Sequence, residues 1–147
     1  MLRIAVQSKG RLYEDTMTLL SEADIKISSS RRTLLVQSRN FPLEVLYLRD
    51  DDIPQSVAMG VADIGIVGEN EFVERAEKAD VVSRLGFSKC HLSLAIPKDQ
   101  EYNGLSWFSG KKISTSYPRI LRDFLQKNGI NAEIHEITGS VEICPGI

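Results

Sequence analysis

The chain has 147 residues, of which 42% are hydrophobic and 26% are charged, a composition typical of a globular protein with one domain or two small lobes. Its formal net charge of -2 argues against a nucleic-acid partner, which would require a broad basic surface. Charged side chains at positions 9 and 11 follow too soon for the apolar core of a signal peptide or membrane span, so we expect a cytoplasmic protein without a membrane partner.

The chain opens with a predicted strand, a basic turn and a helix. Apolar and polar residues alternate over residues 2–7, and apolar residues recur at helical spacing over residues 13–20. Lys9, Gly10 and Arg11 lie between the two segments. A basic turn of this kind can bind a phosphate, or its cations can be solvated on an ordinary loop.

Two further strands are predicted over residues 33–36 and 43–48, separated by a turn-forming segment and paired in an antiparallel or bent arrangement. Arg49 ends the second of these strands. The sequence Asp50-Asp51-Asp52-Ile53-Pro54 is typical of a helix start, because carboxylates favour the positive end of the helix dipole and proline is tolerated in the first turn. A short helix to about Gly60 is expected.

Residues 62–72 indicate a buried parallel strand that leads into a helix. The helix carries apolar residues at Phe72, Val73 and Ala76, and Gly68 lies between strand and helix. Two charge pairs at i,i+4 spacing are expected on its solvated face: Glu71 with Arg75 and Glu74 with Lys78.

The rest of the chain repeats this alternation. Strands are predicted over residues 81–85 and 92–96, and a connection rich in Pro, Gly and charge over residues 97–110 marks a lobe boundary. The second lobe is predicted to contain the following elements: a strand over 112–115, a helix start at Ser116-Tyr117-Pro118, a helix with a buried face at Ile120, Leu121, Phe124 and Leu125 that ends near Gly129, and a strand over 132–137.

This alternation predicts an open α/β fold, in which ligands bind beyond the carboxyl ends of the strands. The first lobe is expected over residues 1–96 and the second over residues 97–147. The last strand lacks the crossover that a parallel connection needs, so we expect the second lobe to be incomplete and the chain to be a truncated form. The stretches that follow apolar runs are the candidates for chemistry: Lys9 to Arg11, Arg49 to Asp52, Gly68 to Asn70, Thr115 to Tyr117 and Thr138 to Glu142.

The bare spacing of these residues leaves several functions open. The pattern is neither a P-loop nor the three-glycine dinucleotide fingerprint, and the absence of that fingerprint after the first strand weighs against a Rossmann-type oxidoreductase. Cys90 and Cys144 are too few and too far apart for a disulfide framework or a zinc site, and His91 adds no ligand spacing, so a structural role is expected for Cys90 and His91.

Five motifs in the same order resemble the catalytic region of ATP phosphoribosyltransferase of the long form. They are "LRIAVQSKGRL", "LRDDDIPQSVAMGVADIGIVGEN", "LGFSKCHLSLAIPKD", "GKKISTSYPRIL" and "ITGSVEICPGI". The resemblance covers essentially the whole chain. It implies two lobes like those of type II periplasmic binding proteins, with a cleft between them, and a chain that ends before the loop that binds the 5-phosphate of the phosphoribosyl donor.

The resemblance also implies a reaction. ATP and phosphoribosyl pyrophosphate condense through adenine N1 to phosphoribosyl-ATP and pyrophosphate, the first step of histidine biosynthesis, in an enzyme expected to be a homo-oligomer that uses Mg²⁺ with the substrate pyrophosphate. The truncated chain is expected to be inactive alone. The alternative is a non-catalytic binding module for nucleotides or small solutes with the same two-lobed fold.

The resemblance assigns roles to the candidate residues. Lys9, Arg11 and Arg49 are expected to bind phosphates of ATP and the pyrophosphate group, as the electrostatic candidates for catalysis. Gly68, Glu69 and Asn70 are expected to line the cleft, where Gly68 allows close backbone approach. For Thr115, Ser116 and Tyr117, a phosphate and base contact or a plain helix cap are both open. The Asp50–Asp52 run is expected to start a helix rather than to bind Mg²⁺, so no metal ligands are assigned.

Overall fold

The computed structural model describes residues 1–28, 33–75 and 77–138. The chain divides into two compact units, Met1–Cys90 and His91–Ile147. Each unit contains its own sheet. Both units alternate strands and helices along the chain, which confirms the predicted α/β class.

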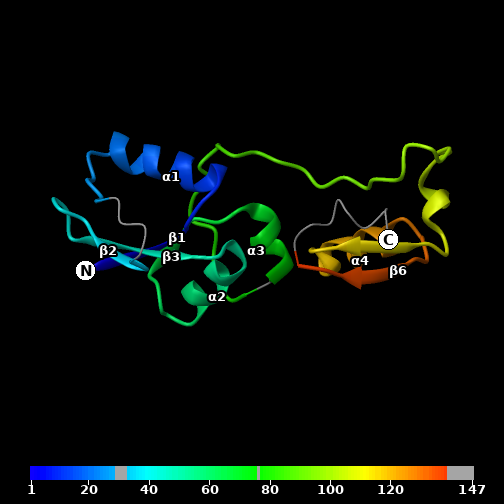
Figure 1. The fold of residues 1–147 in the computed structure, drawn as a ribbon. Helices are drawn as coiled ribbons and strands as arrows, with labels where there is room; N and C mark the ends of the chain where they lie inside the picture. Colours follow the sequence, from blue (N-terminus) through cyan, green and yellow to red (C-terminus); the bar gives the residue numbers. More distant parts are fainter. Residues whose placement is uncertain (29–32, 76, 139–147) are drawn as a thin grey trace. The chain divides into compact units, whose positions relative to one another are not determined.

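The first unit contains a four-stranded mixed sheet with the order β2-β3-β1-β4 (Figure 1). Its strands are β1 (Leu2–Gln7), β2 (Leu35–Gln37), β3 (Leu43–Leu48) and β4 (Ile64–Gly65). β1 is parallel to β3 and to β4, while β2 is antiparallel to β3. The sequence-based prediction of an antiparallel pair is therefore confirmed for β2 and β3, although β2 is shorter than expected and begins two residues later.

Helices cover both faces of this sheet, because successive side chains of β1 point to opposite sides. Ile4 and Val6 pack with Leu20 of α1 (Arg11–Glu22), while Ala5 packs with Ile53 of α2 (Ile53–Ala58). Figure 1 shows α1 and α2 on opposite faces. The acidic run forms a 3-10 turn, η1 (Asp50–Asp52), that leads directly into α2, as the helix-start pattern predicted.

The centre of the first unit is fully buried. Val6, Val45 and Ile53 have no exposed surface, and burial of a side chain of this size stabilises a fold by about 1.5–3 kcal/mol. The two parallel strands that contribute most of these residues are in register from Leu2 opposite Leu43 to Gln7 opposite Leu48. Because of this register, β1 and β3 end at the same level of the sheet.

The second unit contains a β-α-β element. β5 (Lys112–Thr115) and β6 (Glu133–Glu136) pair in parallel, and α4 (Pro118–Lys127) connects them. Leu121 and Leu125 of α4 are buried, and Gly129 ends the helix with a φ of 66°, a conformation that glycine adopts at little cost. The predicted strand, helix start and helix end are confirmed. A 3-10 turn, η2 (Leu105–Phe108), precedes β5.

Two predicted strands are wrong. Residues 81–85 and 92–96 contain no strand, and Val82 is 88% exposed. A strand requires a neighbour that pairs with its N–H and C=O groups, and no described residue provides this neighbour. The apolar content of these two segments was therefore insufficient to define a strand.

The surroundings of β4 and α3 (Glu69–Arg75) also differ from the prediction. β4 is parallel, as expected, but it pairs only with β1 among the described residues, and Ile64 is 38% exposed rather than buried. On α3, Glu71 and Glu74 are each only 7% exposed, so the expectation of a solvated face is wrong. Glu71 does form the predicted ion pair with Arg75, with Oε2 3.3 Å from Nε.

The buried Tyr47 predicts a loss of stability in alkali. Burial, and secondarily the nearby Tyr13, raise the pKa of Tyr47 above its ordinary value of 10.0. Because the folded state favours the neutral phenol, this contribution is complete below the unfolded pKa and is lost as the pH rises through the folded pKa. We expect the urea midpoint to fall above about pH 10, and Tyr47→Phe should make this fall shallower.

The control is Tyr102→Phe, since Tyr102 is 49% exposed and lies in the second unit. It should leave the pH dependence of the first unit unchanged. Equal alkaline profiles for the original chain and Tyr47→Phe would contradict the assignment.

Candidate functional site

Three of the predicted stretches meet at one edge of the first sheet. β3, β1 and β4 are adjacent and parallel, so their carboxyl ends lie at the same edge. Lys9–Arg11 follows β1, Arg49 follows β3, and Gly68–Asn70 follows β4 after two intervening residues. The topology therefore places the predicted phosphate-binding cations and the turn at Gly68–Asn70 at the same edge of the first sheet.

The basic turn after β1 has an open, positively charged geometry. Gly10 is the N-cap of α1, with a φ of 95° and no side chain to cap the helix. Its carbonyl accepts the Glu14 N–H at 3.1 Å. The first amides of a helix have no partner within the helix and bind anions readily. Lys9 and Arg11, both exposed, flank these amides and add two positive charges.

Gln7 is a residue of this turn that the sequence analysis did not identify. Its side-chain Nε2 lies 3.5 Å from the position that a Cβ on Gly10 would occupy. The amide group of Gln7 is therefore directly beside the glycine and offers another hydrogen-bond donor there. The signal in the sequence that could have identified Gln7 is its position at the end of β1, just before the basic turn.

Arg49 lies at the neighbouring strand end but has an acidic partner. Its Nε is 3.4 Å from Oδ1 of Asp51, and the Arg49 side chain is 67% exposed. That oxygen of Asp51 is buried and accepts no hydrogen bond within the described part of the chain, so the contact is an ion pair without hydrogen-bond geometry. The Arg49 side chain is exposed, but the Asp51 oxygen is buried and would lose this partner. Release from Asp51 therefore offsets part of the attraction between Arg49 and a bound anion.

The turn after β4 is connected to the segment that follows α3. Glu69 forms an exposed ion pair with Arg84, with Oε1 2.9 Å from Nη1. Asn70 donates from Nδ2 to Sγ of Cys90 at 3.4 Å. Arg84 and Cys90 therefore lie beside this turn. The sequence analysis did not identify these contacts, because Arg84 and Cys90 are far from Glu69 and Asn70 in the sequence.

In the second unit, Thr115, Ser116 and Tyr117 form the turn between β5 and α4. Oγ1 of Thr115 accepts the Tyr117 N–H at 2.9 Å, and Oγ of Ser116 donates to the Ile137 carbonyl at 2.8 Å. Tyr117 is the N-cap of α4, and its side chain forms no cap hydrogen bond with a described residue. Both hydroxyl groups therefore stabilise the turn itself, and a substrate contact by these residues stays a prediction. Of the stretch Thr138 to Glu142, only Thr138 is among the described residues.

The described ranges of the chain bear on metal binding and on membrane insertion. No group of three or more His, Cys, Asp or Glu side chains that could hold a metal ion is present there. Asp50 instead accepts the Asp51 N–H on its own Oδ1 at 2.8 Å, which is a local turn contact. Within residues 1–28, 33–75 and 77–138, no helix has the length and apolar character required to span a membrane.

Comparison with known proteins identifies relatives over the whole chain. The chain is 76% identical over 147 residues to an ATP phosphoribosyltransferase of Bacteroides thetaiotaomicron, and 77% identical to one of Phocaeicola vulgatus. The alignments cover all of this chain and 52% of each relative. The chain thus spans about half the length of the curated relatives it matches.

A solved structure has the same fold. In the ATP phosphoribosyl transferase (HisG:HisZ) complex from Thermotoga maritima, one chain superposes with a TM-score of 0.69 at 23% identity, and the match covers 99% of this chain and 68% of that chain. The family model of ATP phosphoribosyltransferase (HisG) matches residues 49–147. With two-thirds of its length within that match, this chain belongs to the ATP phosphoribosyltransferase family.

Proposed function

We propose that the chain is the amino-terminal part of an ATP phosphoribosyltransferase that acts in the first step of histidine biosynthesis. The reaction joins adenine N1 of ATP to the anomeric carbon of phosphoribosyl pyrophosphate and releases pyrophosphate. The observation that carries this proposal is the strand-end edge of the first sheet, where the cations of two adjacent parallel strands and the uncapped amides of α1 lie together.

The chemistry requires positioning and charge neutralisation rather than a covalent nucleophile. As the bond to pyrophosphate breaks, negative charge develops on the leaving group, and fixed donors and cations lower this barrier. Lys9 and Arg11 have the charge and exposure for this role. Arg49 can join them once it leaves Asp51. Gly68, Glu69 and Asn70 are proposed to contact the nucleoside, where Glu69 would exchange its surface pair with Arg84 for a ribose or base contact.

The second unit is proposed to supply the opposite side of the site. In this proposal residues 1–96 and 97–147 form the two lobes of a type II periplasmic-binding-protein-like fold, with the nucleotide in the cleft between them. Thr115, Ser116 and Tyr117 lie where β5 ends and α4 begins, as Lys9, Gly10 and Arg11 lie between the end of β1 and the start of α1. This equivalence of position in two β-α units supports a substrate contact by the Tyr117 ring or the two hydroxyl groups.

Mg²⁺ is proposed to reach the site with the pyrophosphate group of the substrate. The described residues offer no cluster of three acidic or histidine ligands, and Mg²⁺ commonly binds through substrate phosphates and water with one or two carboxylates. We assign no residue of this chain as its ligand. The whole enzyme is proposed to be a cytoplasmic homo-oligomer, as the biosynthetic role and the resemblance imply.

The alternative is a nucleotide-binding module without turnover. It is supported by one observation: the chain spans 52% of each of the two relatives described above, so residues needed for turnover can lie in the other half. This alternative shares the nucleotide site with the favoured function. The two differ only in catalysis.

Titration calorimetry with AMP on the 147-residue chain tests the site. We expect AMP to bind and NAD to bind more weakly, because the turn after β1 lacks the dinucleotide fingerprint. Chemical-shift changes on AMP addition should appear at Lys9–Arg11 and Gly68–Asn70. Binding of NAD in preference to AMP, or AMP shifts confined to other residues, would overturn the assignment. Assay of the chain with ATP and phosphoribosyl pyrophosphate then separates catalysis from binding alone.

A further inference from the structure

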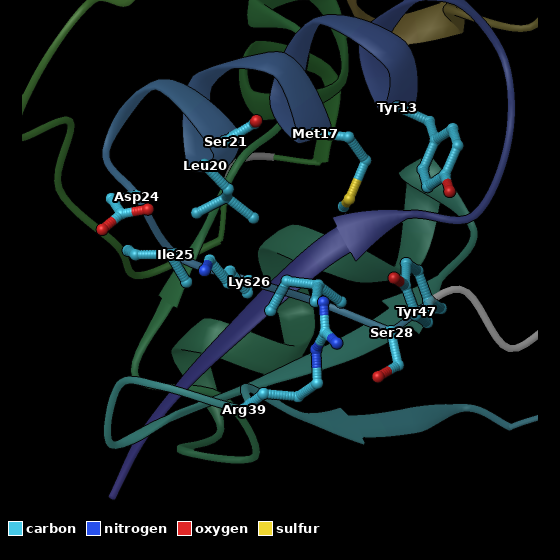
Figure 2. Close-up of a pocket in the computed structure, with 11 residues that line it drawn as sticks. Tyr13, Met17, Leu20, Ser21, Asp24, Ile25, Lys26, Ser28, Arg39 and Tyr47 are labelled. Carbon is cyan, nitrogen blue, oxygen red and sulfur yellow. The ribbon is translucent and has the colours of Figure 1, made fainter.

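A cavity of about 380 Å³ lies in the first unit between α1, residues 24–28, Arg39 of the turn between β2 and β3, and Tyr47 of β3 (Figure 2). Its lining includes none of the residues assigned to the nucleotide site. The volume falls within the range of about 300–1,000 Å³ that is usual for small-molecule sites. The cavity therefore requires a separate explanation.

The inner wall of this cavity is apolar and aromatic. Figure 2 shows Tyr13, Met17 and Leu20 projecting from α1 toward the sheet. The rings of Tyr13 and Tyr47 lie 6.2 Å apart between centroids, at 58° to each other. Two tilted rings beside a flexible thioether can pack against a flat apolar group in several orientations.

The rim carries positive charge that has no ion-pair partner among the described residues. Lys26 and Arg39 line the cavity, are exposed, and form no ion pair with any described residue. Asp24 is the single acid in the lining. The two cations therefore leave one net positive charge at the mouth of a cavity whose inner wall is apolar and aromatic, which complements a ligand with one anionic group.

A hydrogen-bond network fixes this rim in place. Oδ1 of Asn40 accepts the Lys26 N–H at 2.8 Å, and Nδ2 of Asn40 donates to the Asp24 carbonyl. The Arg39 N–H donates to the Lys26 carbonyl at 3.0 Å, and Oγ of Ser38 donates to the same carbonyl at 3.0 Å. The turn between β2 and β3 thus holds the backbone of both cations, so less ordering entropy is lost when a ligand binds.

We propose that this cavity binds a small carboxylate with a flat apolar body. The apolar body packs against Met17 and the two tyrosine rings, and the carboxylate receives hydrogen bonds from Arg39, with Lys26 beside it. Arg39 suits this role because a guanidinium group binds a carboxylate through two parallel hydrogen bonds. The inference goes beyond the proposed transferase function and does not depend on it.

An NMR titration of the 147-residue chain with 2-naphthoate tests the proposal. We expect saturable shifts of the Met17 methyl group and of the Tyr13 and Tyr47 rings. Arg39→Gln should weaken binding by about tenfold, the effect of losing a charge-assisted contact. Arg122→Gln, at an exposed position on α4 in the second unit, is the matched control and should leave the affinity unchanged. The uncharged analogue 2-naphthalenemethanol should bind more weakly than 2-naphthoate.

A blocking variant adds a second readout. Ser21 is exposed and lines the cavity, so Ser21→Trp should fill the mouth and abolish the shifts. Thr18→Trp places the same side chain at an exposed position of α1 outside the lining and should preserve them. Shifts scattered over other apolar surfaces, no binding, or equal affinities of Arg39→Gln and Arg122→Gln would overturn the proposal. AMP binding, measured separately, tests the nucleotide site independently.

Discussion

Gly65→Ala should lower the free energy of unfolding of the first unit by about 1–3 kcal/mol, the usual cost of overpacking a core. A Cβ at this position would lie 2.7 Å from Cγ2 of Ile53 and 3.0 Å from Cγ2 of Val57. Ile53 is fully buried, so a shift of its methyl group would disturb the close packing of its neighbours. The glycine therefore permits α2 to pack directly against β4, at the edge where the candidate site lies.

Gly68→Ala is the matched control for this experiment. No atom of the described residues, apart from the two chain neighbours, lies within 4 Å of a Cβ built on Gly68. Its stability effect should therefore stay within about 0.5 kcal/mol, as for most surface substitutions. Urea unfolding, combined with hydrogen exchange of the Ala5 and Val45 amides, would measure both variants. Equal losses for Gly65→Ala and Gly68→Ala would show that steric contact with α2 is not the cause.

The second large effect is expected from Arg11→Ala in a full-length family member with the same Lys-Gly-Arg turn. Loss of one charge-assisted contact to a phosphate should lower kcat/KM by about tenfold or more, which is about 1.4 kcal/mol or more of transition-state stabilisation. Arg11 is exposed beside the uncapped start of α1, so truncation of its side chain should leave the melting temperature nearly unchanged. Steady-state kinetics and thermal unfolding of the same preparation would separate the two effects.

Arg122→Ala serves as the control, because Arg122 is an exposed arginine of α4 that follows no strand end. It should change neither kcat/KM nor stability. If Arg11→Ala also had unchanged kinetics, Arg11 would be a solvated loop residue and the anion site after β1 would be abandoned. A similar substitution at Arg49 should have a smaller effect on binding, since release from Asp51 offsets part of its contact with the anion.

Local sequence patterns were sufficient to predict an element where short-range interactions determine the backbone conformation. The proline at the start of α4 and the glycine after it gave its limits because both restrict the backbone directly. The alternation in β1 was read correctly because Ile4 and Val6 face α1 on one side of the sheet and Ala5 faces α2 on the other. The apolar residues of 81–85 also predicted a strand, but no described strand offers hydrogen bonds to them.

The candidate site could likewise be predicted only in part from the sequence. The positions after strand ends could be chosen from the sequence, because open α/β sheets bind ligands there. The ion pairs and neighbours of these residues could not be predicted in this way. The ion pairs Arg49–Asp51 and Glu69–Arg84 partly neutralise charges that the sequence analysis treated as free to bind a ligand. Gln7 belongs to the turn because its side chain lies beside Gly10, which the strand pattern does not indicate.

The amino-acid sequence by itself determined the α/β class, the positions of cations after two of the strands, and the family. These properties depend on residue type and spacing, which the chain carries locally. Only the tertiary structure decided that β1 and β3 pair in parallel, that Glu71 and Glu74 are buried, and that Asn40 joins two distant segments beside a cavity. Such contacts join residues far apart in the chain or depend on how whole elements pack, so no periodicity along the sequence reports them.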